Sequence, residues 1–249
     1  MRRLATAVGA ACVLLSVFAA LLLQGVIRVN TPSQARYPVW GVDVSRYQGQ
    51  IDWQALAAQG VRFAFVKATE GSGHEDANFR QNMRLAQQAG VCAGAYHFFS
   101  FESPGEDQAR NLLACLRQWP GQLPCAIDVE LYGAFVDQPP EPRAVRAQLR
   151  KMLEQLEREL GYRPILYATY ESYRAYLAGA FDEYDLWICD VYLWPDLWLR
   201  RPWTFWQYSD RGRLAGYRGE EERIDLNVFC GDEAAFAAYL ASRQTAAAQ

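Results

Sequence analysis

The chain has 249 residues, of which 51% are hydrophobic and 21% charged, and such a composition is typical of a folded protein with a full core. Its formal net charge is −3, and no run of Lys or Arg exceeds two residues. These values exclude a disordered chain and argue against a nucleic-acid partner, which requires a clustered basic surface.

The first 28 residues differ in composition from the rest. Two Arg residues precede an uncharged, mostly apolar stretch from Leu4 to Leu23, which is just long enough to cross a bilayer as a helix. The basic residues predict that the amino end stays cytoplasmic and that everything after Arg28 is exported. We expect residues 1–28 to be a transmembrane signal anchor. A cleaved signal peptide, which would give a secreted protein, is the alternative.

A polar linker over residues 29–37 is followed by apolar, β-rich runs that recur down the chain. Each has the length and the composition of a buried strand. There are eight runs: Val39–Val44, Phe63–Ala68, Val91–Phe99, Cys125–Val129, Pro164–Tyr170, Asp185–Tyr192, Thr204–Tyr208 and Arg223–Phe229.

Helical patterns lie between the first five runs. The clearest is Glu141–Leu160, which has apolar residues on one face and ends at Gly161. Asn78–Ala89 and Glu106–Gln118 are similar but shorter. Strands that alternate with helices imply parallel strands joined by crossovers, and eight strands in about 210 residues imply a closed barrel. Residues 194–203 are too few and too rich in Pro for a regular helix, so the later part of the barrel should be irregular.

Asp128-Val129-Glu130 closes the fourth run. Side chains at positions i and i+2 of a strand point the same way, so these two acids share one face, roughly 7 Å apart at the backbone. Like charges on one face disfavour each other's ionisation, so a purely structural strand gains nothing from them. Glycosidases arrange carboxyl pairs at about this separation. Taken alone, however, the pair is better explained by a solvated edge or loop.

Other acids change this interpretation. Besides the Asp128–Glu130 pair, Asp43, Glu70, Asp190 and Asp225 accompany other predicted strands, so that acids mark five of the eight. Barrel enzymes build their sites at the carboxyl ends of the strands. Because several like charges at one mouth cost stability, the pattern favours a functional site.

The cysteines and histidines give no metal-binding pattern. The chain has no C-x-x-C motif and only two histidines, His74 and His97, so no zinc site is expected. Cys12 lies in the apolar amino-terminal stretch, and the odd number of remaining cysteines leaves at least one unpaired. A Cys115–Cys125 bridge is one candidate pairing. The cysteines that remain to be placed are Cys92, Cys115, Cys125, Cys189 and Cys230.

Seven ordered stretches resemble the lysozymes of glycoside hydrolase family 25, which are N-acetylmuramidases. The resemblance covers residues 38 to about 241 and implies a flattened, irregular (β/α) TIM-like barrel over residues 38–243, followed by a tail over 244–249. The stretches are Trp40–Ser45, Phe65–Gly71, Gly94–Phe98, Ile127–Glu130, Leu186–Ile188, Trp206–Ser209 and Ile224–Phe229.

The resemblance also implies roles for individual residues. Glu130 matches the proton donor to the leaving oxygen, and Asp128 matches the acid that orients the N-acetyl group or stabilises positive charge at the anomeric carbon. Asp43 and Asp225 match two further acids that flank the cleft. By the same resemblance we expect substrate-assisted retention of configuration. The positions that match sugar-binding residues are Tyr96, Tyr167, Trp187, Gln207 and Tyr208.

The leading hypothesis is a membrane-tethered, extracytoplasmic hydrolase that cuts the β-1,4 bond between N-acetylmuramic acid and N-acetylglucosamine in peptidoglycan strands. It needs neither a metal nor an organic cofactor, and we expect a monomer. A non-catalytic wall-binding barrel and a chitinase-like glycosidase are the alternatives. Two departures from the family pattern, Cys189 and Val191, leave the pocket shape near the sixth strand open.

Other polar and aromatic residues have structural interpretations. Lys67 is expected to pair with a barrel carboxylate, and His97, which alternates with Tyr96, is expected to be a buried core histidine. For Glu70, bracing of the strand end and a chemical role are equally favoured. The tryptophans of residues 194–203 are expected to cover an open flank of the barrel, and a platform for sugar binding is the alternative.

Overall fold

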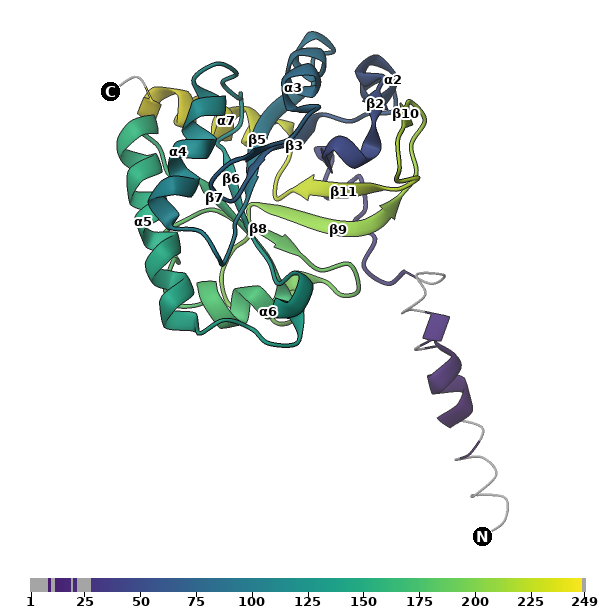
Figure 1. Ribbon diagram of the computed structural model, residues 1–249. Coiled ribbons are helices and arrows are strands. Elements are labelled where there is room, and N and C mark those ends of the chain that lie inside the picture. Colours follow the sequence, from purple (N-terminus) through teal and green to yellow (C-terminus); the bar gives the residue numbers. More distant parts are fainter. Residues whose placement is uncertain (1–8, 10–11, 19, 22–27, 248–249) are drawn as a thin grey trace.

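The computed structural model describes residues 9, 12–18, 20–21 and 28–247 of the chain. Eight strands close into a ring in which every strand pairs with two neighbours (Figure 1), so the predicted eight-stranded barrel is confirmed. In ring order the strands are β1 (Trp40–Val44), β3 (Phe63–Glu70), β5 (Cys92–Phe98), β6 (Ala126–Val129), β7 (Ile165–Thr169), β8 (Leu186–Cys189), β9 (Phe205–Gly212) and β11 (Ile224–Phe229).

Short elements and helices surround this ring. Strand β4 (His74–Glu75) extends it beside β3, while β2 (Gln50–Ile51) and β10 (Tyr217–Arg218) form a separate two-stranded sheet. The three predicted helices are present as α3, α4 and α5. The helices are α2 (Trp53–Ala58), α3 (Phe79–Gln88), α4 (Gly105–Leu116), α5 (Pro142–Leu160), α6 (Tyr170–Ser172) and α7 (Glu233–Ala247), with η1 (Arg46–Gln48), η2 (Gly133–Val136), the π-helix η3 (Tyr173–Leu177) and η4 (Pro195–Leu197).

The longest of these helices, α5, has the signals that its sequence indicates. The Glu141 side chain accepts a hydrogen bond from the Ala144 amide at 2.9 Å, and Pro142 occupies the first turn, where its missing N–H costs nothing. Gly161 ends the helix with φ +73°, a conformation that glycine adopts without strain. Its apolar face is buried, so α5 packs beside α4 on the outside of the ring (Figure 1).

Seven of the strands are parallel, but the eighth is reversed. Strands β1, β3, β5, β6, β7, β8 and β9 pair in parallel around the ring, while β11 is antiparallel to both β9 and β1. The sequence interpretation anticipated irregularity in the later part of the barrel but not this reversal. Because residues 213–223 hold only β10 and no crossover helix, β11 returns beside β9 in the opposite direction.

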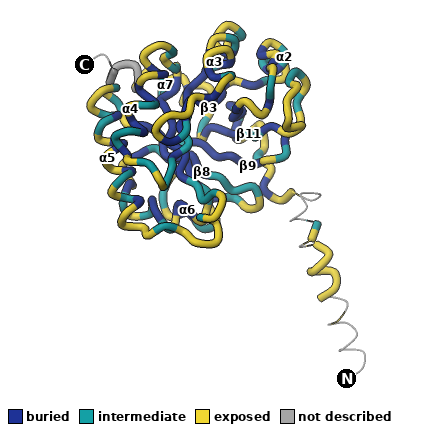
Figure 2. Tube along the Cα trace, viewed as in Figure 1, coloured by how far each residue is buried: buried dark blue, intermediate teal, exposed yellow. Residues whose placement is uncertain are grey.

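The hydrophobic core has two layers, separated by the wall of the barrel. Along β3, Phe63 and Phe65 point into the barrel, while Ala64 and Val66 belong to the layer between the strands and the helices. This alternation follows from the period of two in a strand. The buried strands occupy the centre of the molecule, and exposed residues follow the outer helices (Figure 2).

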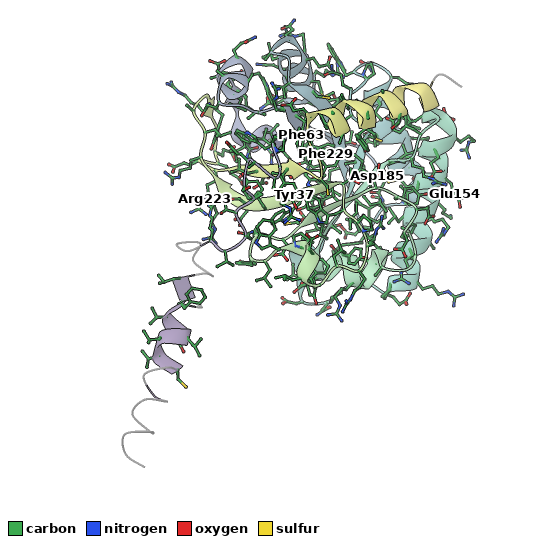
Figure 3. The ribbon with its side chains drawn as sticks, turned by 180° about the vertical axis from the view of Figure 1, so that it is seen from behind. Tyr37, Phe63, Glu154, Asp185, Arg223 and Phe229 are labelled. Atoms are coloured by element: carbon green, nitrogen blue, oxygen red, sulfur yellow. The ribbon has the colours of Figure 1, made fainter. Side chains whose placement is uncertain are left out.

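Helix α7 closes the end of the barrel opposite the carboxyl ends of the parallel strands. Its Phe236 packs with ring centroids 5.9 Å from Phe63 and 5.1 Å from Phe229, and Figure 3 shows the helix beside these two residues. Helix α7 continues to Ala247, beyond the predicted end of the barrel at residue 243. One end of the barrel is therefore filled with aromatic side chains, and a site can form only at the other.

The predicted linker is docked on the barrel. Asn30 is buried, and its amide nitrogen donates to the backbone oxygens of Asp190 at 3.1 Å and Tyr208 at 2.9 Å. Tyr37 is also buried, 5.6 Å from the Trp203 ring. Half of the apolar stretch predicted to span a membrane lies outside the described residues. Among those described, no helix is long and apolar enough to cross a bilayer.

All six cysteines are free thiols, so the candidate Cys115–Cys125 bridge is not formed. The two side chains have different surroundings. Cys115 lies near Glu75 and Arg80, and Cys125 contacts Tyr162. Burial raises the pKa of Cys115 to about 11 and that of Cys125 to about 12. Both thiols therefore stay protonated at neutral pH and act as small apolar side chains.

Candidate active site

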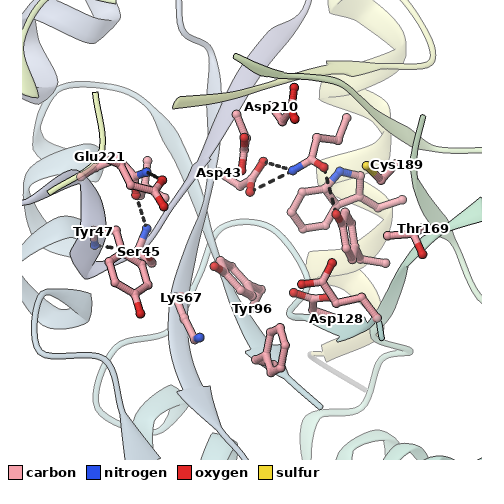
Figure 4. A pocket seen from close by; sticks show the side chains of 18 of the residues that line it. Asp43, Ser45, Tyr47, Lys67, Tyr96, Asp128, Thr169, Cys189, Asp210 and Glu221 are labelled. Atoms are coloured by element: carbon pink, nitrogen blue, oxygen red, sulfur yellow. Dashed lines mark hydrogen bonds between the residues drawn. The ribbon is translucent and has the colours of Figure 1, made fainter. Parts of the chain in front are cut away.

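A cavity of about 410 Å³ opens at the carboxyl ends of the seven parallel strands (Figure 4). Each of the eight barrel strands contributes a side chain to it, as expected for a barrel site. The contributing residues are Asp43 on β1, Lys67 on β3, Tyr96 and Phe98 on β5, Asp128 on β6, Tyr167 and Thr169 on β7, Trp187 and Cys189 on β8, Gln207 and Asp210 on β9, and Asp225 on β11, with Glu130 directly after β6.

Eight of the nine predicted site residues line this cavity, and Tyr208 does not. Gln207 and Tyr208 are neighbours on β9, so they cannot both face the barrel interior. Gln207 points inward. Tyr208 points outward, where its ring lies 5.9 Å from that of Trp206. The expectation that Tyr208 binds sugar is therefore not supported by its position.

A network of amide groups holds Asp43. Gln207 Nε2 donates to both carboxylate oxygens of Asp43, at 2.9 and 3.1 Å, and Asn227 Nδ2 donates to Asp43 Oδ1 at 2.6 Å. Both amides are oriented in turn: Gln207 Oε1 accepts from the Tyr167 hydroxyl at 2.9 Å, and Asn227 Oδ1 accepts from Trp187 Nε1 at 2.8 Å. These bonds keep the Asp43 carboxylate in one orientation.

Asp225 is the partner of Asp43 across β1 and β11. The two residues are directly paired in the register of the strands. Burial raises the pKa of Asp43, although hydrogen bonds from Asn227, Gln207 and Asp225 oppose this shift. Burial and the charge of Asp43 raise the pKa of Asp225 well above its usual value. Each of the two carboxyl groups therefore disfavours ionisation of the other.

Asp128 differs from Asp43 because one of its carboxylate oxygens receives no hydrogen bond from the described residues. It is buried on β6, and its Oδ1 has no hydrogen-bond partner among the residues that the structure describes. Burial and the charge of Glu130 raise its pKa well above the usual value, while Lys67 lowers it. A buried carboxylate oxygen without a donor is costly. This atom is free to accept a hydrogen bond from a bound molecule.

Glu130 lies one residue beyond the end of β6, on the same side as Asp128. Burial, followed by the charge of Asp43, raises its pKa to about 7, while Lys67 opposes this rise. At neutral and mildly acidic pH a large fraction of Glu130 is therefore protonated. Such a carboxyl group can donate a proton, which an exposed glutamic acid cannot do at this pH.

Lys67 is the one base among the residues that line the cavity, beside six acids. Its Nζ lies 2.8 Å from Glu70 Oε2 and 4.7 Å from the centre of the Phe98 ring. The predicted pairing of Lys67 with a carboxylate is confirmed. Glu70, which does not line the cavity, is thereby assigned to bracing Lys67 rather than to chemistry.

The aromatic lining residues differ in their free polar groups. The hydroxyl of Tyr167 and the indole nitrogen of Trp187 are engaged in the Asp43 network. The Tyr96 hydroxyl forms no hydrogen bond within the described part of the chain, and burial together with the surrounding acids raises its pKa well above the usual value. Tyr96 therefore keeps a proton that it can donate to a ligand.

Sequence reasoning missed several residues of this site. Asn227 lies within the Ile224–Phe229 stretch that resembles the family, but it was not predicted to be a site residue. Its spacing of two from Asp225 on one strand was the available signal. Tyr47, Gln48 and Glu221 line the far end of the cavity from loop and 3₁₀ segments, and the sequence offers no local pattern that places them there.

The residues near the sixth strand that depart from the family pattern lie at the cavity. Cys189 and Val191 both line the cavity, whereas Tyr192 is exposed. Asp190 does not face the cavity. Its Oδ1 accepts from the amide of Leu193 at 2.7 Å, and its Oδ2 accepts from Trp198 Nε1 at 2.7 Å. Asp190 therefore braces the loop after β8.

The expected structural role of His97 is confirmed. His97 is fully buried, between Thr69 Oγ1 at 2.7 Å and Gln108 Oε1 at 3.1 Å, and burial lowers its pKa to about 4. Within the described residues, no group of three or more His, Cys, Asp or Glu side chains is arranged to hold a metal ion.

Comparison with known proteins places the chain in a family. The family model described as glycosyl hydrolases family 25 matches residues 42–217. The uncharacterized protein YegX of Escherichia coli O157:H7 is 36% identical over 217 residues, which are 83% of this chain and 75% of that protein. Lysozyme M1 of Streptomyces globisporus is 30% identical over 215 residues, which are 79% and 69% of the two chains.

Solved structures show the same relationship. A family 25 glycosyl hydrolase from Bacillus anthracis matches with a TM-score of 0.78 and 46% identity, covering 84% of this chain and 97% of that one. A bacterial lysozyme from Streptomyces coelicolor matches with a TM-score of 0.69 and 28% identity, covering 82% and 98%. The chain therefore belongs to glycosyl hydrolase family 25 and is a glycoside hydrolase.

Proposed function

We propose that this glycoside hydrolase is an N-acetylmuramidase, which cleaves the β-1,4 bond between N-acetylmuramic acid and N-acetylglucosamine in peptidoglycan. Its relatives include proteins described as lysozyme M1 and autolytic lysozyme. The cavity is lined by six acids and several aromatic side chains, as expected of a site that binds a sugar polymer and stabilises positive charge on it.

In the first step, Glu130 donates its proton to the glycosidic oxygen as the bond from that oxygen to the anomeric carbon breaks. The acetamide oxygen of the same sugar attacks the anomeric carbon and forms a cyclic oxazolinium. Asp128 Oδ1, which lacks a donor among the described residues, accepts the acetamide N–H. A hydrogen bond to the charged form of Asp128 lowers its pKa. Asp128 is thereby kept ionised, and a neighbouring negative charge favours the protonated form of Glu130.

In the second step, the Glu130 carboxylate removes a proton from water. The water oxygen bonds to the anomeric carbon, the bond to the acetamide oxygen breaks, and the neutral acetamide and protonated Glu130 are restored. Two displacements at one carbon retain its configuration. The Asp43–Asp225 pair contributes negative charge in the same cavity and thus favours the cationic transition states.

One observation supports this assignment most directly. The cavity contains both a carboxyl group whose pKa is raised to about 7 and a buried carboxylate oxygen without a donor, two residues apart. A binding protein has no use for the first, since a proton donor matters only if a bond is broken. The second needs a ligand with a hydrogen-bond donor, which the acetamide N–H of an N-acetylated sugar supplies.

The test is the release of new reducing ends from purified peptidoglycan, with mass spectrometry of the sugar at each end. We expect N-acetylmuramic acid at the new termini and a loss of at least about 10³-fold in kcat for Glu130→Gln. Termini that carry N-acetylglucosamine would contradict the proposed bond. Equal activity of Glu130→Gln and the unaltered protein would contradict the proposed acid.

We also propose that residues 1–28 anchor the enzyme in the membrane, with the barrel on the extracytoplasmic side as a monomer. The apolar stretch Leu4–Leu23 and the basic residues before it support this topology. Alkaline extraction of membranes tests it: an anchored chain stays in the pellet at full length. Recovery of a shortened chain in the medium would show cleavage instead.

A further inference from the structure

A second cavity, of about 490 Å³, lies on the flank of the barrel between η3 and the loop that follows β8. Three aromatic side chains and three arginines line it, and they carry the inference that follows. They are Tyr170, Tyr173, Trp198, Arg174, Arg200 and Arg201. None of these residues belongs to the catalytic cavity described above.

The two cavities are close neighbours along the chain. Thr169 lines the catalytic cavity, and the next residue, Tyr170, lines the second one. On the adjacent strand, Cys189 lines the catalytic cavity, and Asp190 directly after it holds Trp198 of the second cavity. The two cavities therefore lie next to each other at the carboxyl ends of β7 and β8, in the direction in which a long polymer can extend from the catalytic cavity.

The aromatic side chains of the second cavity are held in fixed positions. The ring of Tyr170 stands edge-on to that of Trp198, with 4.6 Å between centroids. Trp198 Nε1 donates to Asp190 Oδ2 at 2.7 Å. Tyr170 nevertheless remains 39% exposed. An exposed aromatic edge or face that is already immobile binds flat, amphipathic ligands with little loss of conformational entropy.

The charges of this cavity are the reverse of those in the catalytic one. Arg174 donates to the Tyr170 hydroxyl at 3.0 Å. Arg201 donates to the backbone oxygens of Phe181 and Tyr184 and lies 3.6 Å from Asp182. Arg200 is exposed and forms no hydrogen bond or ion pair within the described part of the chain. Three cations thus face one acid, while the catalytic cavity has six acids and one base.

We infer that the second cavity binds a carboxylate-bearing sugar unit of the same glycan strand, outside the bond that is cleaved. The inference rests on the proposed function, because that function supplies the strand. An arginine guanidinium binds a carboxylate with two parallel hydrogen bonds, and N-acetylmuramic acid carries a carboxylate on its lactyl group. The aromatic residues contact the apolar face of that sugar, and Arg174 and Arg200 contact its carboxylate.

Binding is measured on the full-length protein by NMR, with the indole N–H of Trp198 as the reporter. A Trp198→Phe variant assigns the signal. We expect N-acetylmuramic acid to shift this signal, and N-acetylglucosamine, which lacks the lactyl carboxylate, to leave it in place. The double variant Arg174→Gln/Arg200→Gln should weaken the binding about tenfold or more. Arg84→Gln, an exposed arginine on α3, is the matched control and should bind as the unaltered protein does.

A kinetic measurement tests whether the second cavity binds the polymeric substrate. For insoluble peptidoglycan we expect the double variant to raise KM about fivefold relative to Arg84→Gln, with the change in KM rather than in kcat, since binding and not bond breaking is altered. A Glu130→Gln protein should still show the NMR shift, because that measurement needs no turnover.

The outcomes separate the two proposals. Hydrolysis of peptidoglycan without a Trp198 shift by N-acetylmuramic acid would overturn the second site alone. A shift without hydrolysis would overturn the proposed function alone. Equal shifts by N-acetylmuramic acid and inorganic phosphate would show an unselective anion site, and equal shifts by the two sugars would remove the role of the carboxylate. Either result would reject the inference.

Discussion

Two walls of the catalytic cavity present buried acids that are held in opposite ways. On the wall of β1, β9 and β11, Asp43 accepts hydrogen bonds from Gln207 and Asn227 on both of its oxygens. On the wall of β6, Asp128 keeps one oxygen without a donor among the described residues. Asp43 is therefore held in place before a ligand binds, whereas Asp128 gains its missing hydrogen bond only from a ligand.

This difference indicates which wall of the cavity lowers the stability of the free protein. The Asp43 network stabilises a charged group through donors that are themselves anchored by Tyr167 and Trp187. The Asp128–Glu130 wall is destabilising in the free protein. Two acids are buried close together there, and each raises the cost of ionising the other. Sites with such local destabilisation are common where activity depends on them.

After Glu130→Gln, the largest expected effect on activity is that of Asp128→Asn. The amide can no longer accept the acetamide N–H as a charged group, so kcat should fall about 10²- to 10³-fold. Thermal stability should rise, because a buried ionisable group beside Glu130 is removed. Activity on peptidoglycan and a melting curve measure the two effects. Asp137→Asn, on the exposed surface, is the control. Loss of stability together with activity would mean that Asp128 is as structural as Asp43.

The opposite wall should respond in stability. Gln207→Leu removes two hydrogen bonds from Asp43 and leaves the Tyr167 hydroxyl without its acceptor. We expect a loss of about 2–4 kcal/mol in the free energy of unfolding, as determined by urea denaturation. Gln118→Leu, at an exposed position two residues after α4, should cost well under 1 kcal/mol. A neutral Gln207→Leu would show that the network does not anchor Asp43.

The β6 wall should make stability depend on pH. The pKa of Glu130 is raised to about 7 in the folded protein, so the folded state holds a proton that the unfolded state releases. This stabilisation is fully present below the unfolded pKa and is lost as the pH rises towards 7. Relative to the unaltered protein, Glu130→Gln should therefore gain on the order of 2 kcal/mol between pH 5 and pH 8. Urea midpoints at the two pH values measure the gain, and parallel pH profiles would contradict it.

The smallest effect concerns Lys67, which lowers the pKa of both Asp128 and Glu130. Lys67→Met should shift the alkaline limb of the kcat/KM profile to higher pH by up to about one unit, because Glu130 stays protonated longer. Lys151→Met, on the surface of α5, is the control and should leave the limb in place. A shift to lower pH would show that Glu130 is not the group that titrates.

The sequence was sufficient for much of this fold because its signals are local. The period of the apolar residues defines α5, and Pro142 and Gly161 mark its ends. Asp128 and Glu130 share a face because a strand has a period of two. The same rule places Gln207 and Tyr208 on opposite faces of β9. The sugar-binding role expected of Tyr208 came from family resemblance and did not consider this alternation.

Other features depended on how the strands close into a ring. Asp225 stands near the amino end of β11, and a parallel strand would place it at the opposite end of the barrel from Asp43. The reversal of β11 brings the two acids together. The bonds from Gln207 and Asn227 to Asp43 join residues more than 160 positions apart, which no local pattern encodes.

The sequence by itself determined which residues form strands and which face each side chain takes, and its resemblance to the family predicted which acids bear the chemistry. Only the tertiary structure decided that Asp43 is saturated with donors, that Asp128 is not, and that a cationic second cavity adjoins the acidic one. The physical reason is range: periodicity acts between near neighbours in the chain, while hydrogen-bond satisfaction and electrostatic coupling depend on groups brought together by ring closure.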